Sequence, residues 1–392
     1  MNETLDTSVL DAPEEQQMTM AQAKAIPQTL TVASKEWATR PEDQRFQTLD
    51  ELEEAVVKRR SLSREAVVST SDISADVFED GLRVMSEGND AAEPTNWSFG
   101  QLAKAADFRV GELRKLSAAT AAIVINEQLA KQGAVDIKLM RLLGDDGDKI
   151  QAITSPSYGR IFDAEVVKMV QKVVEMSGGK FYNPKAYAMG KFGAEPVPSG
   201  LYASDRDVFM FMIDGGSIFD AGERAQMNRG FIVSNSEVGK SSLVMMSFMF
   251  NTVCGNHFCF GTTDINIRRI VHSSGAPGRF ATDAFDELML FAKQPVDLSP
   301  FTKAMDVKLS DVRPGGYDFH TERDKWIRAF SEKHGFAIGE TRSAISTAII
   351  EEGKVDTLFD LCQGYTASAR TIPHVDSRLD LEKRATKLIS AL

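Results

Sequence analysis

The sequence predicts an α+β protein with a central antiparallel sheet packed with helices, a helical C-terminal region and a disordered N-terminal tail. Short apolar runs bounded by Gly, Ser and Asp recur between residues 150 and 276, as is typical of strands. Apolar residues at helical spacing dominate 277–392. We therefore expect four regions: the tail at 1–40, an N-terminal α+β region at 41–149, the central core at 150–276 and the helical region at 277–392.

Residues 1–40 are rich in Gln, Glu, Thr and Ala and show no sustained apolar period, which indicates a disordered tail. The segment TLDELEEAVVKRR then places Leu49, Leu52 and Val56 at helical spacing, with acids early and bases late. Val67–Val68 and Phe78 lie between Ser- and Asp-rich pieces and predict short strands.

A helix is expected to follow Pro94, and a second one is predicted over 110–132. Its proposed buried stripe comprises Leu113, Leu116, Ala119, Ile123 and Leu129. The stretch GDDGD at 144–148 is a turn that lacks the further oxygen ligands of a calcium loop.

The central core is expected to begin with a strand at Ile150–Ile153 and a helix at Asp163–Met176, capped by Asp163 and closed by the glycines of SGGK. Antiparallel strands are predicted from about Ala186 to Ser234, with the apolar runs LYA, VFMFMID and GFIVS. The run SSLVMMSFMFNTV, Ser241–Val253, predicts a long buried helix.

Composition excludes several classes of protein. The formal net charge of −11 opposes non-specific attraction to DNA phosphates, although it does not exclude a local basic groove. Three cysteines in a long chain predict reduced thiols and a cytoplasmic location rather than a disulfide framework. The sequence shows neither a membrane-spanning run nor a secretory signal, so no membrane association is expected.

The motif SNSEVGKS at 234–241 comes close to a phosphate-binding P-loop. Gly239, Lys240 and Ser241 match the end of that motif, and a strand–loop–helix context is predicted. However, Ser234 replaces the first glycine, and Glu237 would place a carboxylate beside a triphosphate. The alternative is a helix N-terminus capped by Asn235 or Ser236, with Glu237 in its first turn.

Cys254, His257 and Cys259 lie close together and include atoms that zinc accepts. Their spacing matches no standard zinc knuckle, and alternate residues of a strand point to opposite faces. No nucleophile elbow or metalloprotease motif is present. We therefore assign no catalytic residues and predict no metal and no cofactor; the sequence does not decide whether the protein is an enzyme, and it favours one that is not.

Basic and aromatic residues cluster on both sides of the predicted buried helix. A groove for single-stranded nucleic acid needs cations for phosphates and aromatic faces for bases. The candidates for such a groove are Arg224, Arg229, Lys240, Arg268 and Arg269, with Phe258 and Phe260. The alternative is that Arg268 and Arg269 straddle an ordinary strand, with one side chain solvated and the other paired.

Several segments resemble, in order, the phage- and plasmid-like family catalogued as domain of unknown function 932. They are RPEDQRFQTLDELEEAV, PTNWSFGQLA, SPSYGRIFDAEVV, LYASDRDVFMFMID, RGFIVSNSEVGKSSL, VCGNHFCFG and the C-terminal LCQGYTASARTIPHVDSRLDLEKRA. The resemblance runs from about Pro41 to the C-terminal segment. It implies a protein of a bacteriophage or plasmid that works in the bacterial cytoplasm, and it supplies no catalytic residues.

The predicted order of helix, antiparallel strands and long buried helix is similar to the core of ring-forming single-strand annealing recombinases. This analogy leads to our first hypothesis, an oligomeric accessory protein that binds or anneals single-stranded DNA in recombination or replication. The second hypothesis is a non-enzymatic interaction or structural protein whose partner is a host or phage protein, such as a host-defence inhibitor or a virion-associated component. The third is a nucleotide-binding protein that uses Gly239, Lys240 and Ser241 as a degenerate P-loop.

Overall fold

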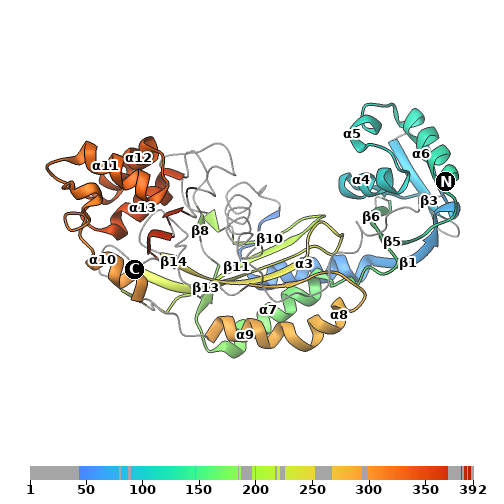
Figure 1. Cartoon of the computed structure of the whole chain (residues 1–392). Helices are drawn as coiled ribbons and strands as arrows, with labels where there is room; N and C mark the ends of the chain where they lie inside the picture. Colours follow the sequence, from blue (N-terminus) through green and yellow to red (C-terminus); the bar gives the residue numbers. More distant parts are fainter. Residues whose placement is uncertain are drawn as a thin grey trace.

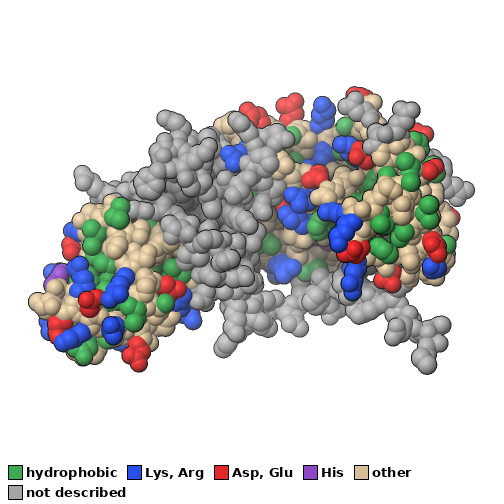
Figure 2. All heavy atoms as spheres, turned by 90° about the horizontal axis from the view of Figure 1, so that it is seen from above, with side chains coloured by type: hydrophobic (Ala, Val, Ile, Leu, Met, Phe, Trp, Pro, Cys, Tyr) green, Lys and Arg blue, Asp and Glu red, His purple; other side chains and the backbone are tan. Residues whose placement is uncertain are grey.

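The computed structural model has both sheets and helices, which confirms the predicted α+β class. The molecule is elongated, with an N-terminal lobe at one end, a sheet in the middle and C-terminal helices at the other end (Figure 1, Figure 2). The described residues are 44–78, 81–86, 90–145, 147–183, 185–186, 197–198, 200–216, 219–220, 226–251, 267–293, 299–369, 381, 384–385 and 387–389. The predicted tail, Arg224, Phe258, Phe260 and the Cys254/His257/Cys259 group lie outside these residues.

The central sheet has seven strands, and every pair of neighbouring strands is antiparallel. Five strands form the order β10-β11-β13-β14-β15, while β7 pairs with β11 and β12 pairs with β13. Their bounds are β7 Phe181–Tyr182, β10 Leu201–Ala203, β11 Val208–Asp214, β12 Phe219–Asp220, β13 Gln226–Asn235, β14 Leu243–Asn251 and β15 Ile267–Ile270. A separate two-stranded pair joins β8 Lys185–Ala186 to β9 Val197–Pro198.

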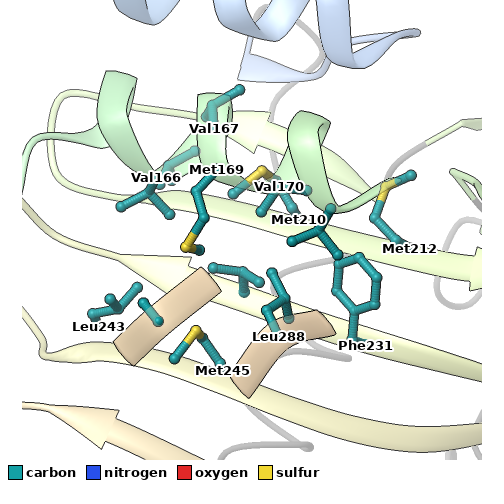
Figure 3. Packing of buried hydrophobic residues seen from close by; sticks show 14 of the residues in the cluster. Val166, Val167, Met169, Val170, Met210, Met212, Phe231, Leu243, Met245 and Leu288 are labelled. Carbon is teal, nitrogen blue, oxygen red and sulfur yellow. The ribbon is translucent and has the colours of Figure 1, made fainter. Parts of the chain in front are cut away.

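Helices cover one face of the central sheet (Figure 1). They are α3 Leu49–Leu62, α7 Asp163–Ser177, α8 Ala276–Arg279, a π-helical turn at Phe280–Ala284 and α9 Phe285–Lys293. The expected helix at Asp163–Met176 is confirmed as α7, and Gly178 closes it in the left-handed conformation. The valines of α7 pack on alternate residues of the strands, such as Met210, Met212 and Phe231 (Figure 3).

The predicted buried helix over Ser241–Val253 is wrong, because Leu243–Asn251 within this run form β14. Leu243 and Met245 join the core beneath the helices, and β14 pairs with both β13 and β15. Leu243, Met245 and Met246 are all buried, so apolar residues occupy both faces of β14 and the sequence shows no two-residue period that would separate it from a buried helix.

The N-terminal lobe consists of a four-stranded sheet, a hairpin and three helices. The sheet has the order β1-β5-β6-β4, and β2 pairs with β3. The bounds are β1 Ser63–Ser69, β2 Ile73–Phe78, β3 Gly81–Ser86, β4 Glu93–Pro94, β5 Asp136–Leu142, β6 Lys149–Thr154, α4 Asn96–Ala105, α5 Val110–Leu113 and α6 Ala118–Gln132, with a 3₁₀ turn at Thr70–Asp72. Because β6 pairs with β5, the sheet of the N-terminal lobe includes residues on both sides of the region boundary expected between 149 and 150.

The single helix predicted over 110–132 is wrong, because the chain forms α5 and α6 with a break between them. Ser117 caps α6 by accepting a hydrogen bond from the Thr120 N–H. The break shifts the helical phase, so the predicted stripe does not hold: Leu116 is 37% exposed and Ile123 is 65% exposed.

The C-terminal helices have their own core around the buried Trp326. The helices are α10 Ser299–Asp306, α11 Arg323–His334, α12 Ile338–Glu352 and α13 Leu358–Ala369, with a 3₁₀ turn at Pro314–Gly316. Gly364 allows α13 to pack closely on α12, because a Cβ there would overlap the carbonyl oxygen of Ala344. In the part of the chain that the structure describes, no helix has the length and apolar character needed to cross a membrane.

Candidate functional site

The P-loop-like motif forms the connection between β13 and β14, which we call the joint loop (residues 236–242). The expected strand–loop–helix context is wrong, because a strand follows the loop. Asn235 and Ser236 therefore cap no following helix. Gly239 adopts a φ of +84°, which suits glycine in this tight connection.

Glu237 instead serves the N-terminus of α7, a helix that begins 74 residues earlier in the chain. Its Oε2 accepts a hydrogen bond at 3.0 Å from the backbone N–H of Asp163, the first residue of α7. A carboxylate is favoured there because the first-turn N–H groups have no partner within the helix and carry partial positive charge. Asp163 was expected to cap α7, but Phe162 occupies the cap position and makes no side-chain cap bond.

Three charged side chains meet in the interior beside the joint loop. Arg59, from the last turn of α3, lies 2.6 Å from Asp163 Oδ2 and 3.2 Å from Glu237 Oε1. Burial, and after it the charge of Glu237, raise the pKa of Asp163 well above its usual range. Burial alone would lower the pKa of Arg59, but the two carboxylates raise it. Asn235 completes the group by donating to Asp163 Oδ1 at 2.8 Å and to the Ile161 carbonyl at 2.9 Å.

Arg160 ties the joint loop to the N-terminal lobe. Its Nε donates to Glu65 Oε1 in β1 at 2.9 Å, and its Nη1 donates to the backbone carbonyl of Glu237. A third donor, Nη2, contacts Thr154 Oγ1 at 3.3 Å. The guanidinium thus connects β1, the end of β6 and the joint loop.

Val238 is the point at which the joint loop docks on α4. Its side chain is fully buried and clusters with Trp97, Phe162, Met140 and Ala152. Its carbonyl accepts two hydrogen bonds from α4, one from Trp97 Nε1 at 3.0 Å and one from Gln101 Nε2 at 2.9 Å. The loop therefore connects the central sheet to the N-terminal lobe.

A buried histidine lies at the same junction. His272 stacks on Tyr158 with ring centroids 5.0 Å apart, and its Nδ1 lies 3.1 Å from the Gly159 carbonyl. Burial, opposed by that hydrogen bond, lowers the pKa of His272 to about 4, with a further contribution from the charge of Arg160. Tyr158 donates to the Ser236 carbonyl at 3.0 Å, and burial raises the pKa of its hydroxyl.

Two of the predicted DNA contacts, Lys240 on the joint loop and Arg269 on β15, lie at this end of the sheet. Lys240 Nζ is 2.5 Å from Asp207 Oδ2, and its backbone N–H donates to Ser236 Oγ at 2.9 Å. Ser236 Oγ also donates to the Arg206 carbonyl at 2.7 Å, which holds the β10–β11 turn against the joint loop. Arg269 is exposed and donates from Nε to Ser242 Oγ at 3.0 Å. We call Arg206, Lys240 and Arg269 the basic loop cluster.

The other two described candidates, Arg229 and Arg268, lie on the helix-covered face. Arg229 donates twice to Asp214 Oδ2, at 3.0 and 2.8 Å. Arg268 lies 3.2 Å from Glu287 in α9, while Arg269 points to the opposite face of β15. The alternative in which this arginine pair straddles a strand, with one side chain paired and the other solvated, is therefore confirmed.

Within the described residues, no three His, Cys, Asp or Glu side chains form a group that could hold a metal ion. Of the three cysteines, Cys362 is described, and it is buried in the C-terminal core. Burial raises the pKa of its thiol, which makes it unreactive as a nucleophile.

Sequence reasoning missed Arg59, Arg160 and Glu65. It placed Glu237 in the first turn of a helix after the joint loop, where the structure has the strand β14. The sequence did contain one local signal: Asn235 and Glu237 lie at the end of a buried strand, and buried polar groups need hydrogen-bond or ion-pair partners. The sequence does not identify those partners, because they come from three distant segments.

Comparison with known proteins adds no relative: no family model, no curated protein and no solved structure matches this chain.

Proposed function

We propose that this chain binds single-stranded DNA through the basic loop cluster, as a protein of the phage- and plasmid-like family that it resembles. The observation that carries the proposal is the arrangement of Arg206, Lys240 and Arg269. These residues come from two turns and a strand, and hydrogen bonds at Ser236 and Ser242 connect these segments. Figure 2 shows Lys and Arg side chains gathered where the N-terminal lobe meets the middle of the molecule.

The spacing of the cluster suits a nucleic-acid backbone. Arg206 lies in the turn between β10 and β11, and Arg269 lies on β15. The strands β11 and β15 are three inter-strand steps apart, which corresponds to about 14 Å. Lys240 lies between them on the joint loop. Such a row can contact successive phosphates without reading sequence, because phosphate contacts carry no base information.

The buried acids beneath the cluster are already paired. Arg59 engages both Asp163 and Glu237 in the interior. Arg269 is exposed, and no carboxylate among the described residues lies within ion-pair distance of it. Arg269 is therefore the cation best placed to meet a phosphate, while Lys240 would exchange Asp207 for one.

The analogy with strand-annealing recombinases loses its basis, because it depended on a long buried helix after the strands and that segment is β14. The P-loop analogy fails in a similar way, because the joint loop is followed by a strand and its Glu237 side chain is buried.

Adjacent arginines offer a matched test. We would titrate a labelled single-stranded oligonucleotide with the native chain, Arg269→Gln and Arg268→Gln, and follow fluorescence anisotropy at several salt concentrations. Each phosphate contact on a single strand contributes about −0.7 to the slope of log K against log salt. We expect Arg269→Gln to weaken binding and to flatten the slope by about that amount. Arg268→Gln removes the same charge from the helix-covered face and should leave the slope unchanged.

Equal slopes for Arg269→Gln and the native chain would refute the assignment of Arg269. Absence of binding at low salt would refute the function itself. Thermal melting of both variants controls for stability, because Arg268→Gln leaves Glu287 without this ion pair.

A further inference from the structure

The first fifteen residues of the chain have the charge needed to compete with DNA. They contain five acids and no Lys or Arg. The acids are Glu3, Asp6, Asp11, Glu14 and Glu15. A block of this kind in the same chain as a basic surface is a candidate ligand for that surface.

The described chain begins beside the basic loop cluster. Arg45 forms a β-bridge with Tyr202, and the Phe46 N–H donates to the Leu201 carbonyl at 2.9 Å. Tyr202 lies in β10, and the turn that contains Arg206 follows this strand directly. The segment before residue 44 is therefore attached within a few residues of the cluster.

Chain length does not limit the contact. Residues 16–43 separate the acidic block from the point of attachment, and an extended chain spans up to about 3.3–3.6 Å per residue. The far end of the cluster, Arg269 on β15, is four inter-strand steps from β10, or about 19 Å. Covalent attachment also makes the local concentration of the block high, of order mM for short tethers.

From these observations we infer that residues 1–15 occupy the basic loop cluster and compete with single-stranded DNA for it. The inference rests on the proposed function, since it assigns a regulator to the same site. The carboxylates would replace phosphates beside Arg206, Lys240 and Arg269. DNA must displace them, so the affinity measured for the full chain is lower than that of the bare cluster. The competition weakens with salt, because both contacts are screened.

The test uses full-length variants with matched net charge. In the first, the five acids of residues 1–15 are changed to Asn or Gln. In the control, five exposed acids of the C-terminal region are changed in the same way, namely Asp306, Asp311, Asp324, Glu332 and Asp356. We expect the first variant to bind the oligonucleotide on the order of threefold to tenfold more tightly at low salt, with the gain lost at high salt. The control should match the native chain.

Equal affinity of the two variants would overturn the inference while leaving the proposed function in place. If the native chain and both variants fail to bind the oligonucleotide, the proposed function is overturned. A second measurement then tests only whether residues 1–15 contact the basic loop cluster. Carbodiimide cross-linking and mass spectrometry report whether Lys240 joins a carboxylate of residues 1–15. The Lys240–Asp207 cross-link serves as the internal reference, because these groups are 2.5 Å apart. A cross-link to the acidic block supports the inference, and the reference product alone contradicts it.

Discussion

His272 should make the folded chain less stable as the pH falls below about 6.5, before most carboxylates begin to titrate. The ring is 6% exposed, and its Nδ1 is within hydrogen-bond distance of the Gly159 carbonyl. No described group accepts a hydrogen bond from Nε2. A second proton would therefore be buried without a partner and close to the positive charge of Arg160.

The magnitude follows from linkage. The pKa of His272 is about 4 in the folded chain, against an ordinary value of 6.5. A histidine whose pKa is lowered by folding contributes stability that is complete above 6.5 and is lost as the pH falls towards 4. At pH 5 the loss is about 2 kcal/mol, and it approaches about 3 kcal/mol at lower pH.

The measurement is urea unfolding of the native chain and of His272→Asn at pH 7 and pH 5. The Asn side chain can still donate to the Gly159 carbonyl but cannot gain a proton. Terms from other titrating groups are common to both proteins, so the difference between the two stabilities isolates His272. We expect this difference to shift in favour of the variant by about 2 kcal/mol on going to pH 5. A difference that stays constant with pH would refute the reasoning.

Three further predictions test the packing and charges around the joint loop. Asp163 has a raised pKa in the folded chain, so its stability contribution is lost as the pH rises. Asp163→Asn should therefore gain stability relative to the native chain as the pH rises above about 4, the ordinary pKa of an aspartate, and a constant difference in urea unfolding would contradict this. Glu237→Ala leaves the buried charge of Arg59 with one carboxylate partner and should lower the free energy of unfolding by about 3–5 kcal/mol. Glu237→Gln keeps an acceptor for the Asp163 N–H and should lower it by less. Equal losses for the two variants would contradict the role of Glu237 as the cap of α7. Gly159→Ala would place a Cβ against the backbone carbonyl of Ser273 and should lower the melting temperature by several degrees. Gly111→Ala serves as the control, because a Cβ there meets no atom within 4 Å. Similar melting temperatures for the two variants would contradict the prediction.

Local sequence signals predicted the elements whose stabilising contacts are also local. The helix from Leu49 begins with a capping box between Thr48 and Glu51, and α7 ends at the left-handed Gly178. The strand at Val208–Asp214 was recognisable from its apolar run. Each of these signals lies within a few residues of the element that it defines.

The segment Leu243–Asn251 shows where local reasoning fails. Its methionines and leucine have high helix propensity, and its apolar character has no period. The decisive factor is tertiary: β13 and β15 provide hydrogen-bonding partners on both sides. Propensity differences of a few tenths of a kcal/mol per residue are small compared with the burial of a central strand.

The joint loop explains why a near-match to a phosphate-binding motif need not bind phosphate. A P-loop works because its backbone N–H groups point at the ligand. Here the Lys240 N–H donates to Ser236 Oγ, and the Gly239 N–H donates to the Ser236 carbonyl. Glu237 and Val238 turn inward to α7 and α4, so the loop is held from beneath while Lys240 remains partly exposed at its tip. The same buried contacts that turn Glu237 and Val238 inward therefore hold Lys240 at the tip of the loop, where we propose that it contacts the DNA backbone.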